Sequence, residues 1–131
     1  MIRISKLVQL GLVVGAMTVC SSVASAQSVA VDANQAKRGK TLWQNRGCAA
    51  CHTIGKGKVA GPDLAGVTSR RDTAWLRRWL KNTDEMLASD SVAQALLAEA
   101  NGVKMPNLKL SDADVTALIH YMAAESEKVK K

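Results

Sequence analysis

Apolar residues recur at helical spacing near the C-terminus, where the best-defined element of the chain is predicted. One helix face collects positions i, i+3, i+4 and i+7, namely Val115, Leu118, Ile119 and Met122. Ser111, with Asp114 three residues later, forms a variant of the capping box that starts such a helix. At about 100° per residue, His120 points roughly 150° away from the centre of the stripe. We expect this helix to pack on the core through the stripe and to carry His120 on its surface.

Three further helices are predicted upstream. The segment Asp32–Gly47 is rich in helix formers, and the segment Asp90–Asn101 ends in Asn101-Gly102, which is typical of a helix C-cap. The segment Asp72–Asn82 carries one apolar side, made of Trp75, Leu76, Trp79 and Leu80. No stretch after residue 26 alternates apolar and polar residues as a half-buried strand would. These patterns predict an all-α protein.

The first 26 residues have the pattern of an export signal. Met1–Lys6 contains two positive charges, Leu7–Val19 is almost entirely apolar, and Ala24-Ser25-Ala26 matches an A-x-A cleavage site. The apolar run of about 13 residues is shorter than the roughly 20 residues that span a bilayer as a helix. We therefore predict a signal peptide over residues 1–26, removed on export to the periplasm, and one domain over residues 27–131.

Two other export signals fit the N-terminus less well. Arg3 has no adjacent second arginine, so the twin-arginine route for folded proteins is not indicated. Val19 is too bulky for the small residue that precedes the modified cysteine of a lipoprotein signal. Cys20 is therefore expected to leave with the signal peptide, and the chain is expected to cross the membrane unfolded.

The composition limits what the core can contain. Of the 131 residues, 47% are hydrophobic but only 3% are aromatic. The core must therefore consist of Ala, Leu, Val and Met, or form around a group that the chain does not encode. The formal charge is +7, and loss of Arg3 and Lys6 with the signal leaves 16 basic against 11 acidic residues. This excess can attract an acidic partner but falls short of the dense basic surface that nucleic acid requires.

The segment Cys48-Ala49-Ala50-Cys51-His52 has the C-x-x-C-H pattern by which c-type haem is attached. Two thiols on one helical turn can add to the two vinyl groups of a porphyrin, and the next side chain can place an imidazole under the iron. The small Ala49 and Ala50 let the ring approach. The pattern predicts one covalent haem c and its iron, attached through Cys48 and Cys51, with His52 as an iron ligand.

Other uses of two nearby cysteines fit this sequence less well. A disulfide between Cys48 and Cys51 would close a very short loop and leave His52 without a task. A thioredoxin-like dithiol needs a βαβ setting that the hydrophobic pattern does not provide. A zinc site needs four ligands, and beyond these three residues only His120 remains.

Four stretches follow one another along residues 39–121. They are Gly39–Trp43 leading to Gly47–His52, Gly61-Pro62-Asp63-Leu64, Gly102–Leu108 and Leu110–Tyr121. Together they resemble the class I c-type cytochromes, the mitochondrial-type and bacterial monohaem proteins. The resemblance implies a cytochrome c-like fold of about four or five helices around one haem c, with the N- and C-terminal helices crossing where Gly39 and Trp43 meet Tyr121. It also implies that the Pro62 carbonyl accepts a hydrogen bond from His52 and that Met105 supplies a sulfur ligand.

The residues around Met105 support its assignment as the second axial ligand. Met105 precedes Pro106, which disfavours a helix at Met105, and it follows Asn101-Gly102, so we expect it in an extended loop. Met86 and Met122 lie in helical patterns and are expected to fill the core. For a buried haem propionate, the indole of Trp75 or Trp79, or a nearby arginine, is a candidate partner.

Two axial ligands leave the iron no open position for a substrate, which indicates a one-electron carrier rather than an enzyme. Such a carrier diffuses freely or serves as a subunit of a larger oxidoreductase. We expect redox proteins as its partners, no small-molecule substrate, and contact with the membrane only through respiratory partners. Two alternatives stay open, a haem protein whose Met105 is displaced by a small ligand or peroxide, and a thiol redox or metal module without haem.

A ring of lysines is expected around the exposed haem edge, where it could steer an acidic partner. Its members are Lys56, Lys58, Lys104 and Lys109. The segment Gly55–Lys58, beside the attachment turn, is expected to be a flexible loop.

Overall fold

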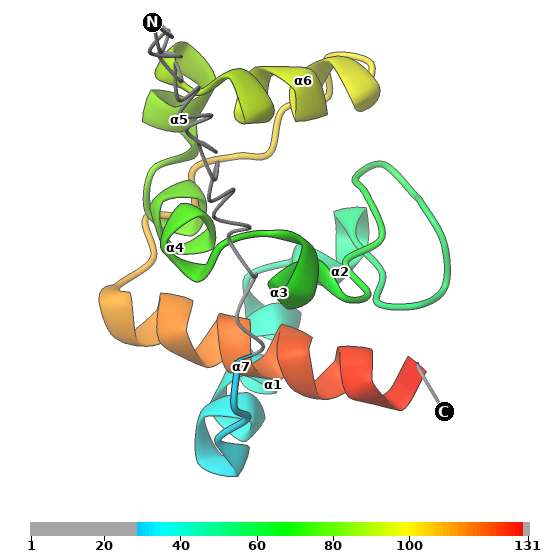
Figure 1. Ribbon diagram of the computed structural model, residues 1–131, viewed down its shortest axis with the longest axis vertical. Helices are drawn as coiled ribbons and strands as arrows, with labels where there is room; N and C mark the ends of the chain where they lie inside the picture. The colour runs from blue at the N-terminus through cyan, green and yellow to red at the C-terminus, as the bar shows by residue number, and fades with distance from the viewer. Residues whose placement is uncertain (1–28, 130–131) are drawn as a thin grey trace, which may run out of the picture.

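The computed structural model describes residues 29–129, and within that range the chain forms helices and no strand. The helices are α1 (Ala33–Asn45), α2 (Cys48–Cys51), α3 (Val67–Arg70), α4 (Thr73–Lys81), α5 (Thr83–Ser89), α6 (Ser91–Glu99) and α7 (Asp112–Val129) (Figure 1). The all-α expectation is confirmed, and the predicted signal peptide over residues 1–26 lies outside the described residues. The described helices outnumber the four or five expected, because α2 and α3 are single turns and α5 precedes α6 as a separate short helix.

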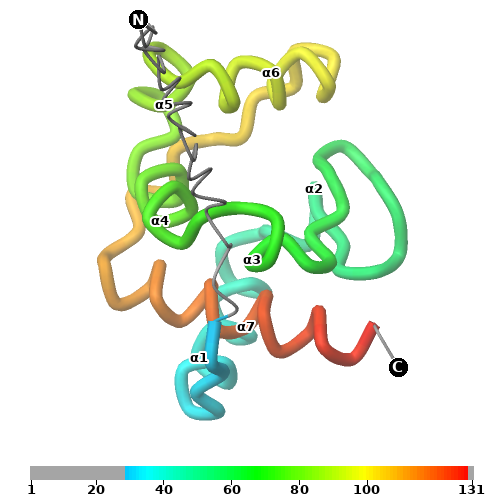
Figure 2. The backbone as a smooth tube through the Cα atoms, viewed as in Figure 1, coloured from blue at the N-terminus to red at the C-terminus, as the bar shows by residue number. Residues whose placement is uncertain are grey.

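Helices α1 and α7 cross, as the family resemblance implied, and the crossing depends on Gly39 (Figure 2). A Cβ atom added to Gly39 would overlap the Ala117 carbonyl oxygen and lie 2.6 Å from the Tyr121 Cβ. One turn further along α1, the Trp43 ring packs against Tyr121 with ring centroids 5.6 Å apart. The absent side chain thus lets the two backbones touch, while Trp43 fills the space beside the contact.

The start of α7 has the predicted capping arrangement. The Asp114 backbone N–H donates to Ser111 Oγ at 3.2 Å, and the Ser111 backbone N–H donates to Asp114 Oδ2 at 3.3 Å. The predicted stripe is buried, with Val115, Leu118, Ile119 and Met122 each 1–4% exposed. His120 lies off this face and is partly exposed, and its Nδ1 accepts a hydrogen bond from the Asp32 backbone N–H at 3.1 Å. This bond ties α7 to the residue that caps α1.

Helices α4, α5 and α6 form a second group, in which α5 and α6 lie farthest from α7 (Figure 1). Each begins at a side-chain cap, with Asp72, Asn82 and Asp90 accepting backbone N–H groups of the first turn. Met86 of α5 is 4% exposed, in agreement with its expected place in the core. Within residues 29–129 no helix is both long and apolar enough to cross a membrane.

Replacing Gly39 by valine should destabilise the protein by about 1–3 kcal/mol or more, because the side chain would force α1 and α7 apart. Chemical denaturation of the purified protein measures the change. Lys40→Val is the matched control, since Lys40 is the next residue of α1 and is exposed. Equal losses in the two variants would show that the helix propensity of valine, and not the crossing, accounts for the effect.

Candidate functional site

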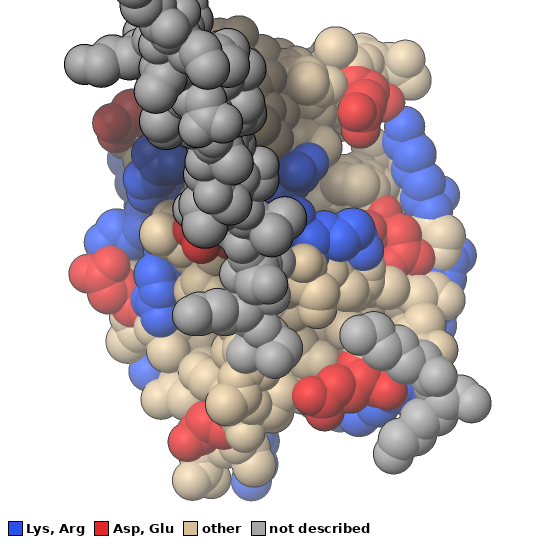
Figure 3. All heavy atoms as spheres, in the orientation of Figure 1, with Lys and Arg blue, Asp and Glu red and all other residues tan. Residues whose placement is uncertain are grey.

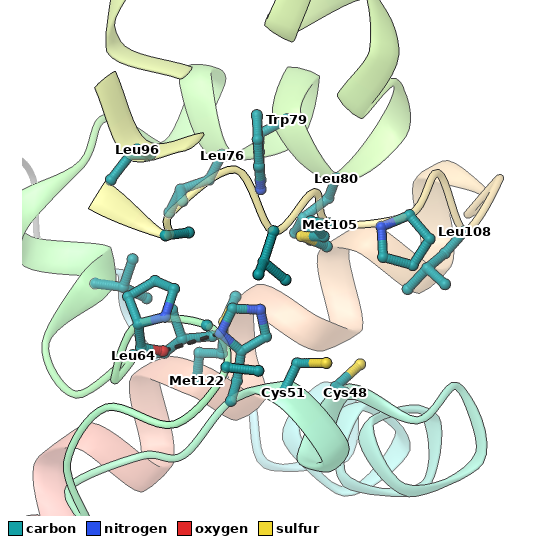
Figure 4. Close-up of a pocket in the computed structure, with 18 of the residues that line it drawn as sticks. Cys48, Cys51, Leu64, Leu76, Trp79, Leu80, Leu96, Met105, Leu108 and Met122 are labelled. Atoms are coloured by element: carbon teal, nitrogen blue, oxygen red, sulfur yellow. Dashed lines mark hydrogen bonds between the residues drawn. The ribbon is translucent and has the colours of Figure 1, made fainter. Parts of the chain in front are cut away.

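Helix α2 places the two cysteines and the histidine of the C-x-x-C-H motif on one short stretch of backbone. Gly47, with a φ of 72°, starts the turn in the left-handed conformation, and His52 leaves it in an extended one. Both cysteines are free thiols, and their sulfur atoms lie side by side at the edge of one cavity (Figure 4). Burial raises the pKa of the Cys48 thiol above its usual value. No disulfide joins the pair within residues 29–129.

The His52 imidazole is oriented by the chain that follows it. Its Nδ1 lies 2.9 Å from the Pro62 carbonyl oxygen, to which an Nδ1–H donates (dashed line in Figure 4). With the proton on Nδ1, the Nε2 lone pair is left for a metal. The close passage of the chain requires Gly61, because a Cβ atom there would lie 2.5 Å from His52 Cε1 and 2.9 Å from the Cys51 carbonyl oxygen. The sequence pointed to Pro62 but not to this role of Gly61.

Met105 lines the same cavity from the loop between α6 and α7, on the side opposite the cysteines (Figure 4). Its loop is held at the residues on both sides. Lys104 Nζ pairs with Asp84 Oδ1 at 2.5 Å, and Asn107 Nδ2 donates to Asp84 Oδ2 at 3.2 Å and to Asn82 Oδ1 at 3.1 Å. Hydrogen bonds from Lys104 and Asn107 lower the pKa of Asp84. The start of α5 therefore anchors the Met105 loop. No pattern in the sequence near Met105 predicts this contact.

The cavity between these two segments has a volume of about 370 Å³ and mainly apolar walls. Its apolar lining includes Trp43, Leu64, Val67, Leu76, Trp79, Leu80, Leu87, Leu96, Leu97, Leu108, Leu118 and Met122. His120 and Met86 are not among the lining residues, whereas Met122 is, so it forms part of the cavity wall as well as of the core. The cavity therefore combines apolar walls with two thiols, an imidazole and a thioether. This combination suits a flat apolar ring that carries a metal.

The cytochrome c family model matches residues 36–125. The chain belongs to the cytochrome c family. Among solved structures, the chain resembles cytochrome c from Rhodothermus marinus with a TM-score of 0.69 and 29% identity, covering 76% of this chain and 83% of that one. It also resembles the cytochrome c domain of a Pseudomonas putida protein, with a TM-score of 0.61 and 43% identity over 69% of this chain and 89% of that one.

A curated relative of this cytochrome c is a nitric oxide reductase subunit from Paracoccus denitrificans. The two are 28% identical over 120 residues, which are 85% of this chain and 74% of that relative. Family membership implies a covalently bound haem c with its iron and a role in electron transfer. Cys48 and Cys51 fit the attachment motif, so a module without haem is excluded. Among residues 29–129 no group of three or more His, Cys, Asp or Glu side chains could hold a separate metal ion.

The cavity of this cytochrome distinguishes between the two tryptophans considered for a propionate. Trp79 lines the cavity, and its indole nitrogen points into it (Figure 4). Trp75 stacks on Trp79 at 5.5 Å and donates its Nε1–H to Asp90 Oδ2 at 3.2 Å instead. Arg71 lies over the Trp75 ring at 5.7 Å and also lines the cavity. Trp79 is therefore better placed than Trp75 to donate into the cavity, and Arg46, Arg70 and Arg71 also line it.

The expected lysine ring is only partly present around the cavity. Of the four lysines, Lys104 lines the cavity, where it is paired with Asp84. Lys58 Nζ donates to the Glu99 carbonyl oxygen at 2.7 Å, which links the loop after α2 to the end of α6. Basic and acidic side chains alternate on the visible face around its hollow (Figure 3). The charged lining residues are Arg46, Asp63, Arg70, Arg71, Glu99 and Lys104, a moderate basic excess.

Proposed function

We propose that this protein is an exported, periplasmic one-electron carrier whose haem c is joined to Cys48 and Cys51 and ligated by His52 and Met105. The observation that carries the proposal is the cavity, which brings the motif of α2 and the loop of Met105 together from opposite sides. Residues 1–26 act as the signal peptide in this proposal, and residues 27–131 form the exported cytochrome domain.

The side chains around the cavity suit electron transfer without bond making at a substrate. When bound, haem c supplies an iron that changes by one electron between its ferric and ferrous states. Pro62 accepts the His52 Nδ1–H, which fixes the ring and strengthens Nε2 as a donor. Met105 supplies a soft thioether, which favours the ferrous state and raises the potential. The His52–Pro62 bond and the contacts that anchor the Met105 loop hold both side chains in place.

The anchored Met105 loop favours a carrier over a haem protein that binds a small ligand or peroxide. Asp84 and Asn82 hold Lys104 and Asn107, the residues that flank Met105, so displacing the sulfur requires breaking these contacts or bending the loop between them. A ligand-binding protein would need that movement at every turnover.

Redox proteins are the proposed partners, with no nucleic acid or small-molecule substrate. The Paracoccus denitrificans relative is part of nitric oxide reductase. By this likeness, the protein either diffuses between larger complexes or docks as the cytochrome component of one, and it meets the membrane only through such partners.

Absorption spectra of the protein in both redox states test this proposal, together with a denaturing gel stained for haem. We expect covalent haem, low-spin spectra in both states, and no binding of carbon monoxide to the reduced protein at neutral pH. Carbon monoxide binding would instead favour the alternative with a displaceable Met105.

In Trp79→Phe, the pH range over which the midpoint potential falls should move upward by about one pH unit. A shift of this size corresponds to the loss of one hydrogen bond to a charged group. The indole N–H stabilises an ionised propionate and lowers its pKa, so its loss raises that pKa. The potential then falls with rising pH over a higher pH range. Trp75→Phe is the control, because its N–H bonds Asp90. A shift in the control of equal size would contradict the assignment to Trp79.

Docking to an acidic redox partner should depend on salt, with rates that fall roughly tenfold or more as ionic strength rises from low values. Lys56→Glu should weaken this dependence, because Lys56 lies on the exposed loop after α2. Lys37→Glu is the control, since Lys37 lies in the half of α1 that is remote from α6 (Figure 1). Stopped-flow electron transfer measures the rates, and equal slopes in all three proteins would show that the loop does not guide the encounter.

A further inference from the structure

The carboxylate of Asp63 is surrounded by backbone donors. Asp63 Oδ1 accepts the N–H groups of Gly55 at 2.8 Å and of Ala65 at 2.7 Å, and Oδ2 accepts the N–H of Gly57 at 2.6 Å. The Thr53 hydroxyl lies 3.1 Å from Oδ2 and 2.5 Å from the Gly57 carbonyl oxygen, so it is shared between these two acceptors. Hydrogen bonds from Gly55 and Ala65, followed by that from Gly57, hold the pKa of Asp63 well below its usual range. The group is therefore a fixed anion at neutral pH.

These contacts join the two chain stretches that hold His52 and Pro62. The Gly61 N–H donates to the Cys51 carbonyl at 2.7 Å, and the Leu64 N–H donates to the Thr53 carbonyl at 2.8 Å. The His52–Pro62 hydrogen bond lies between these two backbone bonds in sequence. The Asp63 side chain extends the pairing from Thr53 to the loop that follows it.

The loop beyond Thr53 has a conformation that needs such an anchor. Gly55 and Gly57 have φ values of 82° and 87°, in the region that favours glycine. In this conformation both N–H groups reach one carboxylate. The expected flexible loop is therefore closed around Asp63, with Arg70 adding a hydrogen bond to the Asp63 carbonyl oxygen at 3.4 Å.

We propose that Asp63 is a positioning residue that keeps the Pro62 carbonyl on His52 Nδ1 and thereby sets the donor strength of the imidazole. The proposal rests on His52 being an iron ligand, as proposed above. Without the carboxylate, three N–H groups lose their acceptor and the stretches 51–57 and 61–65 separate more readily. A weaker bond to Pro62 makes His52 a poorer donor, which favours the ferrous state and raises the potential.

Asp63→Ala and Asp63→Asn of the full holoprotein test the proposal through the His52 Nδ1 proton. We expect this proton to exchange with deuterium about tenfold faster or more in Asp63→Ala, because local opening becomes easier, together with an upward shift of the midpoint potential. Asp63→Asn should have an intermediate effect, since its single amide oxygen can keep the contacts of Oδ1. Nuclear magnetic resonance measures the exchange, and redox titration measures the potential.

Two further variants separate positioning from loss of a charge. Gly57→Ala keeps the Asp63 carboxylate but strains the loop at a φ of 87°, with no atom within 4 Å to obstruct the new methyl group. Gly57→Ala should also speed the exchange of the His52 Nδ1 proton. It still tests the proposal if Asp63→Ala does not yield a haem-loaded, folded protein. Asp72→Ala removes a carboxylate that also accepts two backbone N–H groups, those of Ala74 and Trp75, and should leave the exchange unchanged.

The outcomes distinguish this proposal from the proposed function. A potential that rises in Asp63→Ala while the exchange rate stays at the wild-type value would overturn the positioning role and leave only a charge effect. An unchanged rate in Gly57→Ala and Asp63→Asn would overturn it as well. If the wild-type spectra show that no histidine ligates the iron, the proposed function itself fails, independently of Asp63.

Discussion

Replacing Cys48 and Cys51 together by alanine should abolish covalent haem and remove most of the folded structure. The cavity of about 370 Å³ has apolar walls contributed by the helices α1, α3, α4, α5, α6 and α7. Without the ring these apolar walls face water, which costs about 25 cal/mol per Å² of apolar surface, and the whole stability of a small domain is only about 5–15 kcal/mol. The helices should therefore fail to dock without the cofactor.

Intact mass and far-ultraviolet circular dichroism measure this result. The exported wild-type protein should exceed the mass of residues 27–131 by one haem, whereas the double variant should show the mass of the chain alone and reduced helicity. Ala50→Ser is the control, because Ala50 is an exposed residue of the same turn. A wild-type protein without the added mass would contradict haem attachment, and a mass that includes residues 1–26 would contradict the predicted cleavage.

The parts of the fold that were predictable have local signals in the sequence. The C-terminal helix carries its own cap and a complete apolar stripe, and the structure places all four stripe residues in the core. The C-x-x-C-H motif contains its three functional side chains within five residues, so no tertiary information was needed to find it. The position of Gly39 at the helix crossing required the family resemblance, since a single glycine in a helix gives no sign of its partner.

The parts that could not be predicted depend on contacts between distant residues. The single-turn helices α2 and α3 are too short to show a hydrophobic period. The segment Gly55–Lys58 has the composition of a flexible loop. Only the structure shows that the N–H groups of Gly55 and Gly57 bind the Asp63 carboxylate and hold the loop in place. Likewise, the preference for Trp79 over Trp75 rests on Asp90, which accepts the Trp75 indole N–H and lies 15 residues beyond Trp75.

The same limit applies to Asp84, which anchors the Met105 loop from the start of α5. Lys104, Asn107 and Asp84 are polar residues of unremarkable spacing in the sequence. Their contacts hold Met105 at the cavity. One role of the segment between α4 and the Met105 loop is therefore to anchor that loop. The sequence singles out Met105 as the proposed ligand, but the contacts that hold its loop form only in the tertiary structure.

In the proposed function Met105 is an iron ligand, so Met105→Ala should open a coordination position of the iron. The thioether competes with any external ligand. The apparent affinity for imidazole is therefore proportional to the fraction of molecules in which the sulfur has left the iron. Its removal should raise that affinity about tenfold or more and convert part of the ferric protein to a high-spin form. The midpoint potential should fall, because the sulfur that favours the ferrous state is gone. Imidazole titration of the ferric protein and redox titration measure the two effects.

Two other methionine variants complete this test. Met86→Ala should reduce stability without changing the spectrum, because Met86 is buried in α5 and does not line the cavity. Met122→Leu is the sharper control, since Met122 is a second methionine of the cavity wall and leucine preserves most of its volume. Met122 lies on the buried stripe of α7, whereas the Met105 loop lies on the opposite side of the cavity. We therefore expect only Met105→Ala to free a coordination position of the iron. A spectrum that survives Met105→Ala but is lost in Met122→Leu would assign the sulfur ligand to α7 instead.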